Sequence, residues 1–423
     1  MQTKNFDPYD FSKKEIDGVS VYYKNLPWVP CINIRIVFNN GAFDDSIGKE
    51  GLSHFLEHLL LKGCPSIPNK KAIKEWSKIN ALNTLNAFTS FDNTWYTLKC
   101  LPDKYDVVIS GLKDMIFNSF LRDEDIEEER KVITQEAWNN YLNDKYLKYL
   151  KEFVDIMYSG NQRSRIASAL GWPDTINNIT KNDIVSWHKK NYGIGNFYIV
   201  MTGAIEIEHV KKLEDFIKDL PHVSSCDEEF GIINKPKQNK IIKRADDVGE
   251  VKEQVEISVY RITRETPYKT NEITNIFSRL VYDLLNEKLR TELSLCYGVS
   301  SNVWRTKKFT QMSIGVKTDE KNIEIVENEI KYIFDNIINK KYIDRFNLIK
   351  NLYKEQIKSA EFFSGDIAQN ALSEISRFNG HIVSQEEQLR DIEKTTYDDI
   401  VGLAKHIFDP EYMCTEIILP SKK

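Results

Sequence analysis

Residues 51–63 read Gly-Leu-Ser-His-Phe-Leu-Glu-His-Leu-Leu-Leu-Lys-Gly and place His54, Glu57 and His58 in the order H-x-x-E-H. On a helix, positions i and i+4 lie on one face, so His54 and His58 can direct two imidazoles at one metal ion. Glu57 reaches the same face and is close enough to act on a water ligand of that ion. Two imidazoles with one carboxylate suit zinc and leave a fourth position open. The surrounding leucines and phenylalanine predict that this helix packs into a core, and Gly63 is well placed to end it.

This pattern can also arise by chance on any helix, in which case the three side chains would have no joint role. However, two of the 7 histidines of the chain fall here, within a strongly apolar stretch. Burying two histidines and a glutamate without a partner would be costly. We therefore predict a metal site at His54 and His58.

The segments around this helix predict a mixed sheet. Residues 19–24 and 31–38 form expected strands, and the alternation in the second predicts one buried face and one mixed face. Residues 83–91 and 94–101 predict a hairpin. Its first arm contains Asn86, Ala87, Phe88 and Thr89. If this arm is a sheet edge near the metal, it could pair with an extended peptide by strand addition. The alternative is an internal strand with no binding role.

A long acidic helix is expected from Asp123 to about Lys145. It carries Glu129 and Glu136, which lie on one face across two turns. A solvated helix face is the ordinary interpretation of such glutamates. Because H-x-x-E-H supplies only two ligands, this helix is a good source of the third.

The second half of the chain repeats the first. Residues 180–192 align without gaps with residues 396–408, and the match continues into the next strand, where Phe197 aligns with Met413. Such an internal repeat predicts two homologous domains. We expect an α+β fold in which each domain has a sheet, mostly antiparallel, covered by helices. The predicted boundaries are an N-terminal domain at 1–222, a linker at 223–250 and a C-terminal domain at 251–423, whose first strand is expected at 251–260. The second domain lacks H-x-x-E-H.

Composition excludes several other classes of protein. The net charge of −5 gives no argument for nucleic-acid binding, and no apolar run is long enough for a membrane span. The beginning of the chain has no signal-peptide pattern. The six cysteines are scattered, which predicts free thiols in a reducing compartment. A cytoplasmic location is therefore expected.

The second domain offers one further pair of candidate residues. Residues 276–292 predict a helix that carries Arg290, and Tyr297 begins the following strand. Arginine can bind a carboxylate or a carbonyl, and a tyrosine hydroxyl can donate to a developing oxyanion. An ordinary ion pair and a core tyrosine are the alternative.

Taken in order, these motifs resemble the pitrilysin/insulysin/mitochondrial-processing-peptidase family of zinc metallopeptidases, the inverzincins, and the half-length bacterial members in particular. Residues 51–58 are similar to the metal-binding helix of the family and residues 86–89 to its substrate-pairing edge strand. Residues 129–136 resemble the segment that holds its distal ligand, and residues 289–297 its C-terminal Arg/Tyr motif.

The resemblance implies a role for each candidate. His54, His58 and Glu136 would be the Zn²⁺ ligands, Glu57 the general base and Glu129 a supporting carboxylate. Asn86, Ala87 and Phe88 would hold the substrate backbone. Arg290 and Tyr297 would reach the substrate from a different domain.

The same resemblance implies that the two domains form half of a clamshell, which closes into a chamber by pairing. A homodimer with shared sites is expected, because this chain contains both motifs; a heterodimer with a homologous subunit is the alternative. The expected activity is zinc-dependent endoproteolysis of unfolded peptides, such as leader, presequence-like or precursor peptides, in peptide processing. The competing hypotheses are a non-catalytic peptide-binding or scaffold subunit of a heterodimeric peptidase, and a metal-storing or metal-sensing protein.

Overall fold

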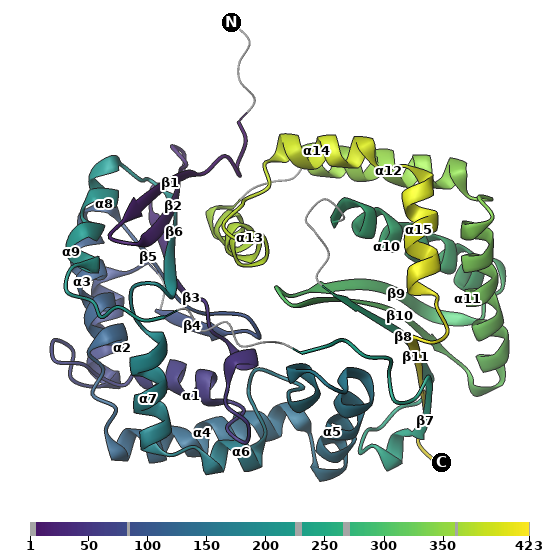
Figure 1. Cartoon of the computed structure of the whole chain (residues 1–423), viewed down its shortest axis with the longest axis horizontal. Coiled ribbons are helices and arrows are strands. Elements are labelled where there is room, and N and C mark those ends of the chain that lie inside the picture. Colours follow the sequence, from purple (N-terminus) through teal and green to yellow (C-terminus); the bar gives the residue numbers. More distant parts are fainter. Residues whose placement is uncertain (1–5, 83–84, 225–230, 265–270, 360–362, 423) are drawn as a thin grey trace, which may run out of the picture. The chain divides into compact units, whose positions relative to one another are not determined.

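The computed structural model describes residues 6–82, 85–224, 231–264, 271–359 and 363–422. It contains two compact units, each made of three separate stretches of chain. The first comprises Met1–Asn140, Ile166–Glu229 and Glu361–Ser384, and the second comprises Tyr141–Arg165, Phe230–Ala360 and Gln385–Lys423. Each unit is built on one sheet (Figure 1).

The sheet of the first unit has the strand order β1-β2-β6-β3-β5-β4. Its strands are β1 (Ser12–Ile16), β2 (Val19–Asn25), β3 (Ile32–Phe38), β4 (Asn86–Thr89), β5 (Thr94–Cys100) and β6 (Phe197–Gly203). Only β2 and β6 pair in parallel, and the other neighbours are antiparallel. Strand β4 lies at one end of this order, so the predicted hairpin of β4 and β5 places its first arm at a sheet edge.

The sheet of the second unit repeats this topology in the order β7-β11-β8-β10-β9. Its strands are β7 (Lys240–Arg244), β8 (Val255–Arg264), β9 (Cys296–Arg305), β10 (Phe309–Thr318) and β11 (Met413–Leu419). The parallel pair of β7 and β11 corresponds to that of β2 and β6. The sheets therefore confirm the predicted pair of homologous α+β repeats.

The repeat is also visible in two helix starts. Helix α7 (Lys181–Asn191) begins after Thr180, whose hydroxyl accepts a hydrogen bond from the Asp183 amide. Helix α15 (Tyr397–Ile407) begins in the same way after Thr396, which accepts from Asp399. These reciprocal caps satisfy amides that the first helical turn leaves unpaired.

Helices cover both sheets. The remaining helices of the first unit are α1 (Leu52–Leu60), α2 (Lys70–Asn80), α3 (Tyr105–Phe117), α4 (Asp123–Tyr141), α6 (Pro173–Asn178), α8 (Ile207–Lys211), α9 (Leu213–Ile217) and α13 (Ser364–Arg377). Those of the second are α5 (Asp144–Tyr158), α10 (Asn271–Leu285), the π-helical segment η6 (Asn286–Glu292), α11 (Ile323–Ile338), α12 (Ile343–Lys358) and α14 (Gln385–Lys394). No helix within the described ranges has the length and apolar character needed to cross a membrane.

Each repeat contributes one helix to the unit built on the sheet of the other repeat. Helix α13 packs on the first sheet, where Thr202 donates to the Ser364 carbonyl at 2.8 Å and Tyr198 donates to the Leu372 carbonyl at 3.2 Å (Figure 1). Helix α5 belongs to the second unit, where the hydroxyl of Tyr149 donates to Glu416 on β11. Strand β7 also lies within the segment expected to be a linker. The domain boundaries drawn from the sequence stay a prediction, and the compact units divide the chain differently.

Helix α13 also corrects the expectation for β3. The alternation along this strand predicted one mixed face, but all seven residues from Ile32 to Phe38 are buried. Arg35 lies on that face and donates through Nη2 to the Gly365 carbonyl at 3.0 Å. A helix from a distant part of the chain therefore covers the face that the local pattern predicted to be mixed.

Candidate metal centre

The helix that carries H-x-x-E-H is held at its start by a buried aspartate. Asp45 accepts hydrogen bonds from the amides of Gly51 at 2.7 Å and Ser53 at 2.9 Å. The hydroxyl of Ser53 also donates to the Asp45 carboxyl at 2.6 Å. Gly51 has φ of 101°, and a Cβ built there would lie 2.6 Å from the Leu170 carbonyl oxygen. Only glycine fits this position without strain, which favours Gly51 as the residue that precedes α1.

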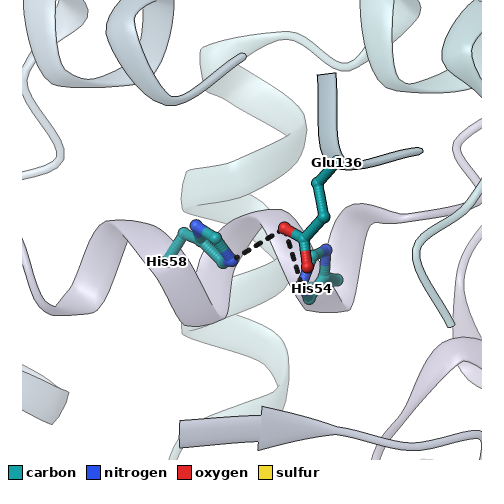
Figure 2. A group of neighbouring side chains, drawn as sticks. All are labelled: His54, His58 and Glu136. Carbon is teal, nitrogen blue, oxygen red and sulfur yellow. Dashed lines mark ion pairs between the residues drawn. The ribbon is translucent and has the colours of Figure 1, made fainter. Parts of the chain in front are cut away.

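His54, His58 and Glu136 come together in the first unit. Figure 2 shows both imidazoles on α1, with the Glu136 carboxylate reaching them from α4. Glu136 Oε2 lies 4.0 Å from His54 Nε2 and 3.7 Å from His58 Nε2. One ligand atom from each residue lies within 4.8 Å of the other two, so the three side chains could hold a metal ion.

The chemistry and spacing of these side chains fit zinc. Ligand atoms about 2.0–2.2 Å from a tetrahedral ion are separated by roughly 3.4 Å, so the three ligand atoms would have to move closer together to bind one ion. His54 is buried, and its Nδ1 has no hydrogen-bond partner within the described residues. Burial, followed by the neighbouring His58, lowers the pKa of His54 to about 3, so the ring is neutral at physiological pH. A buried neutral imidazole directed at a second imidazole and a carboxylate is well suited to metal binding.

A second carboxylate, that of Glu129, orients His58. Nδ1 of His58 lies 2.9 Å from Glu129 Oε2, and a hydrogen bond donated by Nδ1 would leave Nε2 of His58 as the free ligand atom. Burial opposes protonation of His58, but the bond to Glu129 and the charges of Glu57, Glu129 and Glu136 outweigh it and raise the pKa. Glu129 is itself almost fully buried, 1% exposed, and is held by Lys62. Burial would raise the pKa of Glu129, yet the contacts with His58 and Lys62 lower it to about 2.

Glu57 has one carboxylate oxygen engaged and the other available. The hydroxyl of Thr89, on β4, donates to Glu57 Oε2 at 2.8 Å. Within the described part of the chain, no hydrogen bond to Oε1 is formed. Burial raises the pKa of Glu57 to about 7, against the opposing effects of Thr89 and His58. A carboxylate poised near neutrality can take up and release a proton at physiological pH.

Strand β4 presents its side chains alternately to the two faces of the sheet. Asn86 and Phe88 are exposed, whereas Ala87 is buried on the side from which Thr89 contacts Glu57. Phe88 is 43% exposed and stacks on Trp95 of β5 with ring centroids 5.3 Å apart. Asn83, which the sequence assigned to this arm, lies outside the described residues. The predicted backbone-binding residues therefore lie on the edge strand that also supports Glu57.

Arg290 and Tyr297 belong to the second unit. Arg290 is exposed in the π-helical segment η6, and Tyr297 is exposed near the start of β9. The predicted single helix of residues 276–292 is in fact α10 followed by η6, a rare geometry that often accompanies functional positions. The first unit brings together His54, Glu57, His58, Glu129, Glu136 and the β4 residues, whereas Arg290 and Tyr297 belong to the second unit. Their role toward a substrate stays a prediction.

Two residues that contact the site, Lys62 and Thr89, were assigned no role from the sequence. Lys62 follows His58 by four residues, so its helical spacing was a signal that could have identified it. Thr89 lies in the segment proposed to bind a peptide, but no local pattern indicates that its hydroxyl contacts Glu57.

Fold and site together define a class: a protein of two homologous α+β repeats, of which only the first carries an H-x-x-E-H helix. Family models agree with this description. The model described as insulinase, peptidase family M16, matches residues 20–166, and that described as the peptidase M16 inactive domain matches residues 178–353. The chain belongs to peptidase family M16.

Individual relatives cover different shares of the chain. An "uncharacterized zinc protease" of Rickettsia felis is 26% identical over 93% of this chain and 93% of its own length. The mitochondrial-processing peptidase subunit beta of Caenorhabditis elegans is 30% identical over 46% of this chain and 42% of its own. The crystal structure of the periplasmic protease PqqL of Escherichia coli superposes with a TM-score of 0.83 at 15% identity, covering 97% of this chain and 47% of that chain.

The comparison with PqqL corrects the expected cytoplasmic location. PqqL is periplasmic, so this fold occurs outside the reducing cytosol. The prediction of a cytoplasmic location from the sequence is therefore wrong. Free cysteines gave weak grounds for it: Cys64, Cys100, Cys296 and Cys414 are buried, and Cys226 lies outside the described residues. Burial limits the access of a thiol to oxidants and partners in any compartment.

Proposed function

We propose that this chain is a zinc-dependent endopeptidase that hydrolyses unfolded peptides. The observation that carries the proposal is the grouping in one unit of His54, His58 and Glu136, with one ligand atom each within 4.8 Å of the others, beside Glu57. Membership of family M16 and the zinc proteases among its relatives support the assignment.

Each side chain has a distinct part in this proposal. His54, His58 and Glu136 hold the metal, and Glu129 keeps the His58 ring in the orientation that presents Nε2. A bound zinc ion would polarise a carbonyl and make a water ligand acidic near neutral pH. Glu57 Oε1 takes the proton of the attacking water and passes it to the leaving amine. Thr89 holds the other oxygen of Glu57 and so fixes the direction of the first.

The exposed edge of β4 supports an extended peptide as the substrate. A peptide added as a further strand would hydrogen-bond to the backbone of Asn86, Ala87 and Phe88. Main-chain pairing needs an unfolded segment, so leader, presequence-like and precursor peptides fit better than folded proteins. Because β4 also carries Thr89, this binding mode delivers the peptide beside Glu57.

We further propose that two copies of the chain share their sites. The H-x-x-E-H helix lies in one repeat, and the exposed Arg290 and Tyr297 lie in the other. In a two-fold dimer, the metal-binding repeat of each copy would meet the Arg290 and Tyr297 of its partner copy. There Arg290 would hold the substrate and Tyr297 would donate to the developing oxyanion. A heterodimer with a homologous subunit is the alternative, and the relative named as a subunit beta keeps it open.

A digest of mixed unstructured peptides tests the proposed activity. Purified protein, expressed alone, is incubated with the peptides with and without a zinc chelator, and the products are identified by mass spectrometry. We expect internal cuts that disappear with the chelator and return with added zinc. A protein that binds no zinc and cuts no peptide would contradict the proposal.

A further inference from the structure

Lys62 is a buried cation at the end of the metal-binding helix. It lies in the turn that follows α1, where its amide donates to the Leu59 carbonyl at 3.1 Å. Only 4% of the residue is exposed. A lysine is rarely buried to this extent unless its ammonium group is paired.

The partners of Lys62 are adjacent carboxylates on α4. Its Nζ forms an ion pair with Glu129 Oε1 and lies 3.1 Å from Glu128 Oε1. Helix α4 also carries Glu136, so Lys62 connects the helix of the two histidines with the helix of the third candidate ligand.

The Glu129 carboxylate divides its two oxygens between two partners. Oε1 contacts Lys62, and Oε2 contacts His58 Nδ1 at 2.9 Å. A carboxylate bound on both sides cannot rotate freely, so Lys62 fixes the plane in which Glu129 meets the imidazole. Removal of the cation would leave a buried carboxylate with one ordered partner fewer.

We infer that Lys62 is a positioning residue for the metal centre, acting through Glu129 on the orientation of His58. The inference rests on the proposed function, because it takes these residues to be a zinc site. Outer contacts of this kind commonly change metal affinity by about 10- to 100-fold.

A second lysine gives a matched control. Lys70 Nζ lies 3.5 Å from the same oxygen of Glu129, but the Lys70 side chain is 68% exposed. An exposed ammonium group is solvated and only loosely held, so its loss should matter little to the orientation of the carboxylate. The two lysines differ in burial while sharing one partner atom.

The experiment compares zinc affinity in the parent protein, K62M, K70M, E129Q and the double variant K62M/E129Q. Affinity is measured by competition with a chromophoric zinc chelator, and the visible spectrum of the Co²⁺-loaded proteins reports ligand geometry. Circular dichroism and thermal unfolding of the metal-free proteins check the fold. If K62M does not fold, K62Q carries the same expectation, because glutamine is one atom shorter than lysine and has no charge to pair with Glu129.

We expect K62M to bind zinc at least about tenfold more weakly than the parent, with an altered cobalt spectrum. The zinc affinity of K70M should stay within about twofold of that of the parent. The double variant K62M/E129Q should bind zinc only slightly more weakly than E129Q does, because the two changes act through one contact. Parent-like affinity in K62M, or additive losses in the double variant, would overturn the inference. A parent protein that binds no zinc would instead overturn the proposed function, and the inference with it.

Discussion

The hydroxyl of Thr89 donates to Glu57 Oε2 at 2.8 Å, which joins the edge strand β4 to the glutamate of the H-x-x-E-H helix. Strand β4 pairs only with β5 in the described sheet order, so its outer edge has no strand partner among the described residues. The residue that orients the proposed base therefore belongs to the strand proposed to bind the substrate. In the proposed mechanism, substrate binding and the orientation of the base therefore depend on one strand.

The Thr89 contact predicts a change in pH dependence. Burial raises the pKa of Glu57 and the Thr89 hydroxyl lowers it. T89V removes the lowering contribution, so the pKa of Glu57 should rise and the acid limb of kcat/KM should move to higher pH. A hydrogen bond to a charged group contributes about 1.5–3 kcal/mol, which corresponds to roughly 1–2 pH units. T89S keeps the hydroxyl and serves as the control, and identical acid limbs in the two variants would contradict the contact.

Zinc affinity should fall as the pH is lowered through the raised pKa of His58. His54 stays neutral because burial lowers its pKa to about 3, whereas the contact with Glu129 favours the protonated form of His58. Zinc must displace that proton, so the apparent affinity should fall about tenfold for each pH unit below this pKa.

Chelator competition between about pH 5 and pH 9 measures this dependence. E129Q removes the contact that favours protonated His58, so the decline should begin at lower pH in that variant. An affinity that does not change across the range would exclude His58 as a zinc ligand.

Shared sites predict recovery of activity in a mixture of two inactive variants. E57Q lacks the proposed base, and Y297F lacks the proposed oxyanion donor on the other repeat. In a mixed dimer, one of the two sites would combine an intact Glu57 with an intact Tyr297. Random exchange of subunits should therefore restore about a quarter of the parent activity.

The same mixture discriminates between architectures. If each chain works alone or uses its own Tyr297, the mixture of E57Q and Y297F would be no more active than the two variants measured separately. Y282F is the control for loss of an exposed hydroxyl in the second unit, since Tyr282 lies on α10 and is also exposed. Y282F should retain the parent rate. A mixture of Y282F with E57Q should be as active as a mixture of the parent protein with E57Q.

The sequence predicted elements with strong local patterns well. The strand expected at 31–38 is β3 (Ile32–Phe38), and the expected acidic helix begins at Asp123 as α4 does. The buried position of Arg35 could not be predicted, because the carbonyl that it contacts belongs to Gly365, 330 residues away in the chain. Contacts of that kind depend on how the chain folds back on itself, which local periodicity does not encode.

In the candidate site too, local sequence patterns predicted some residues, whereas other contacts depend on the tertiary structure. Helical spacing predicted that His54 and His58 share a face, and the acidic helix supplied Glu129 and Glu136 as candidate ligands. The spacing of Lys62 from His58 carried the same helical signal. The contact of Thr89 with Glu57 joins a strand to a helix, so it required the tertiary structure.

The most direct test of the central proposal is the activity and zinc content of E57Q beside the parent protein. Glu57 is not among the proposed ligands, so E57Q should bind about one zinc ion per chain with parent-like affinity, while chelator-sensitive peptide cleavage falls by about 10²- to 10⁴-fold. Near-parent cleavage by zinc-loaded E57Q would contradict the account, because the proton transfer assigned to Glu57 would then be made by another group.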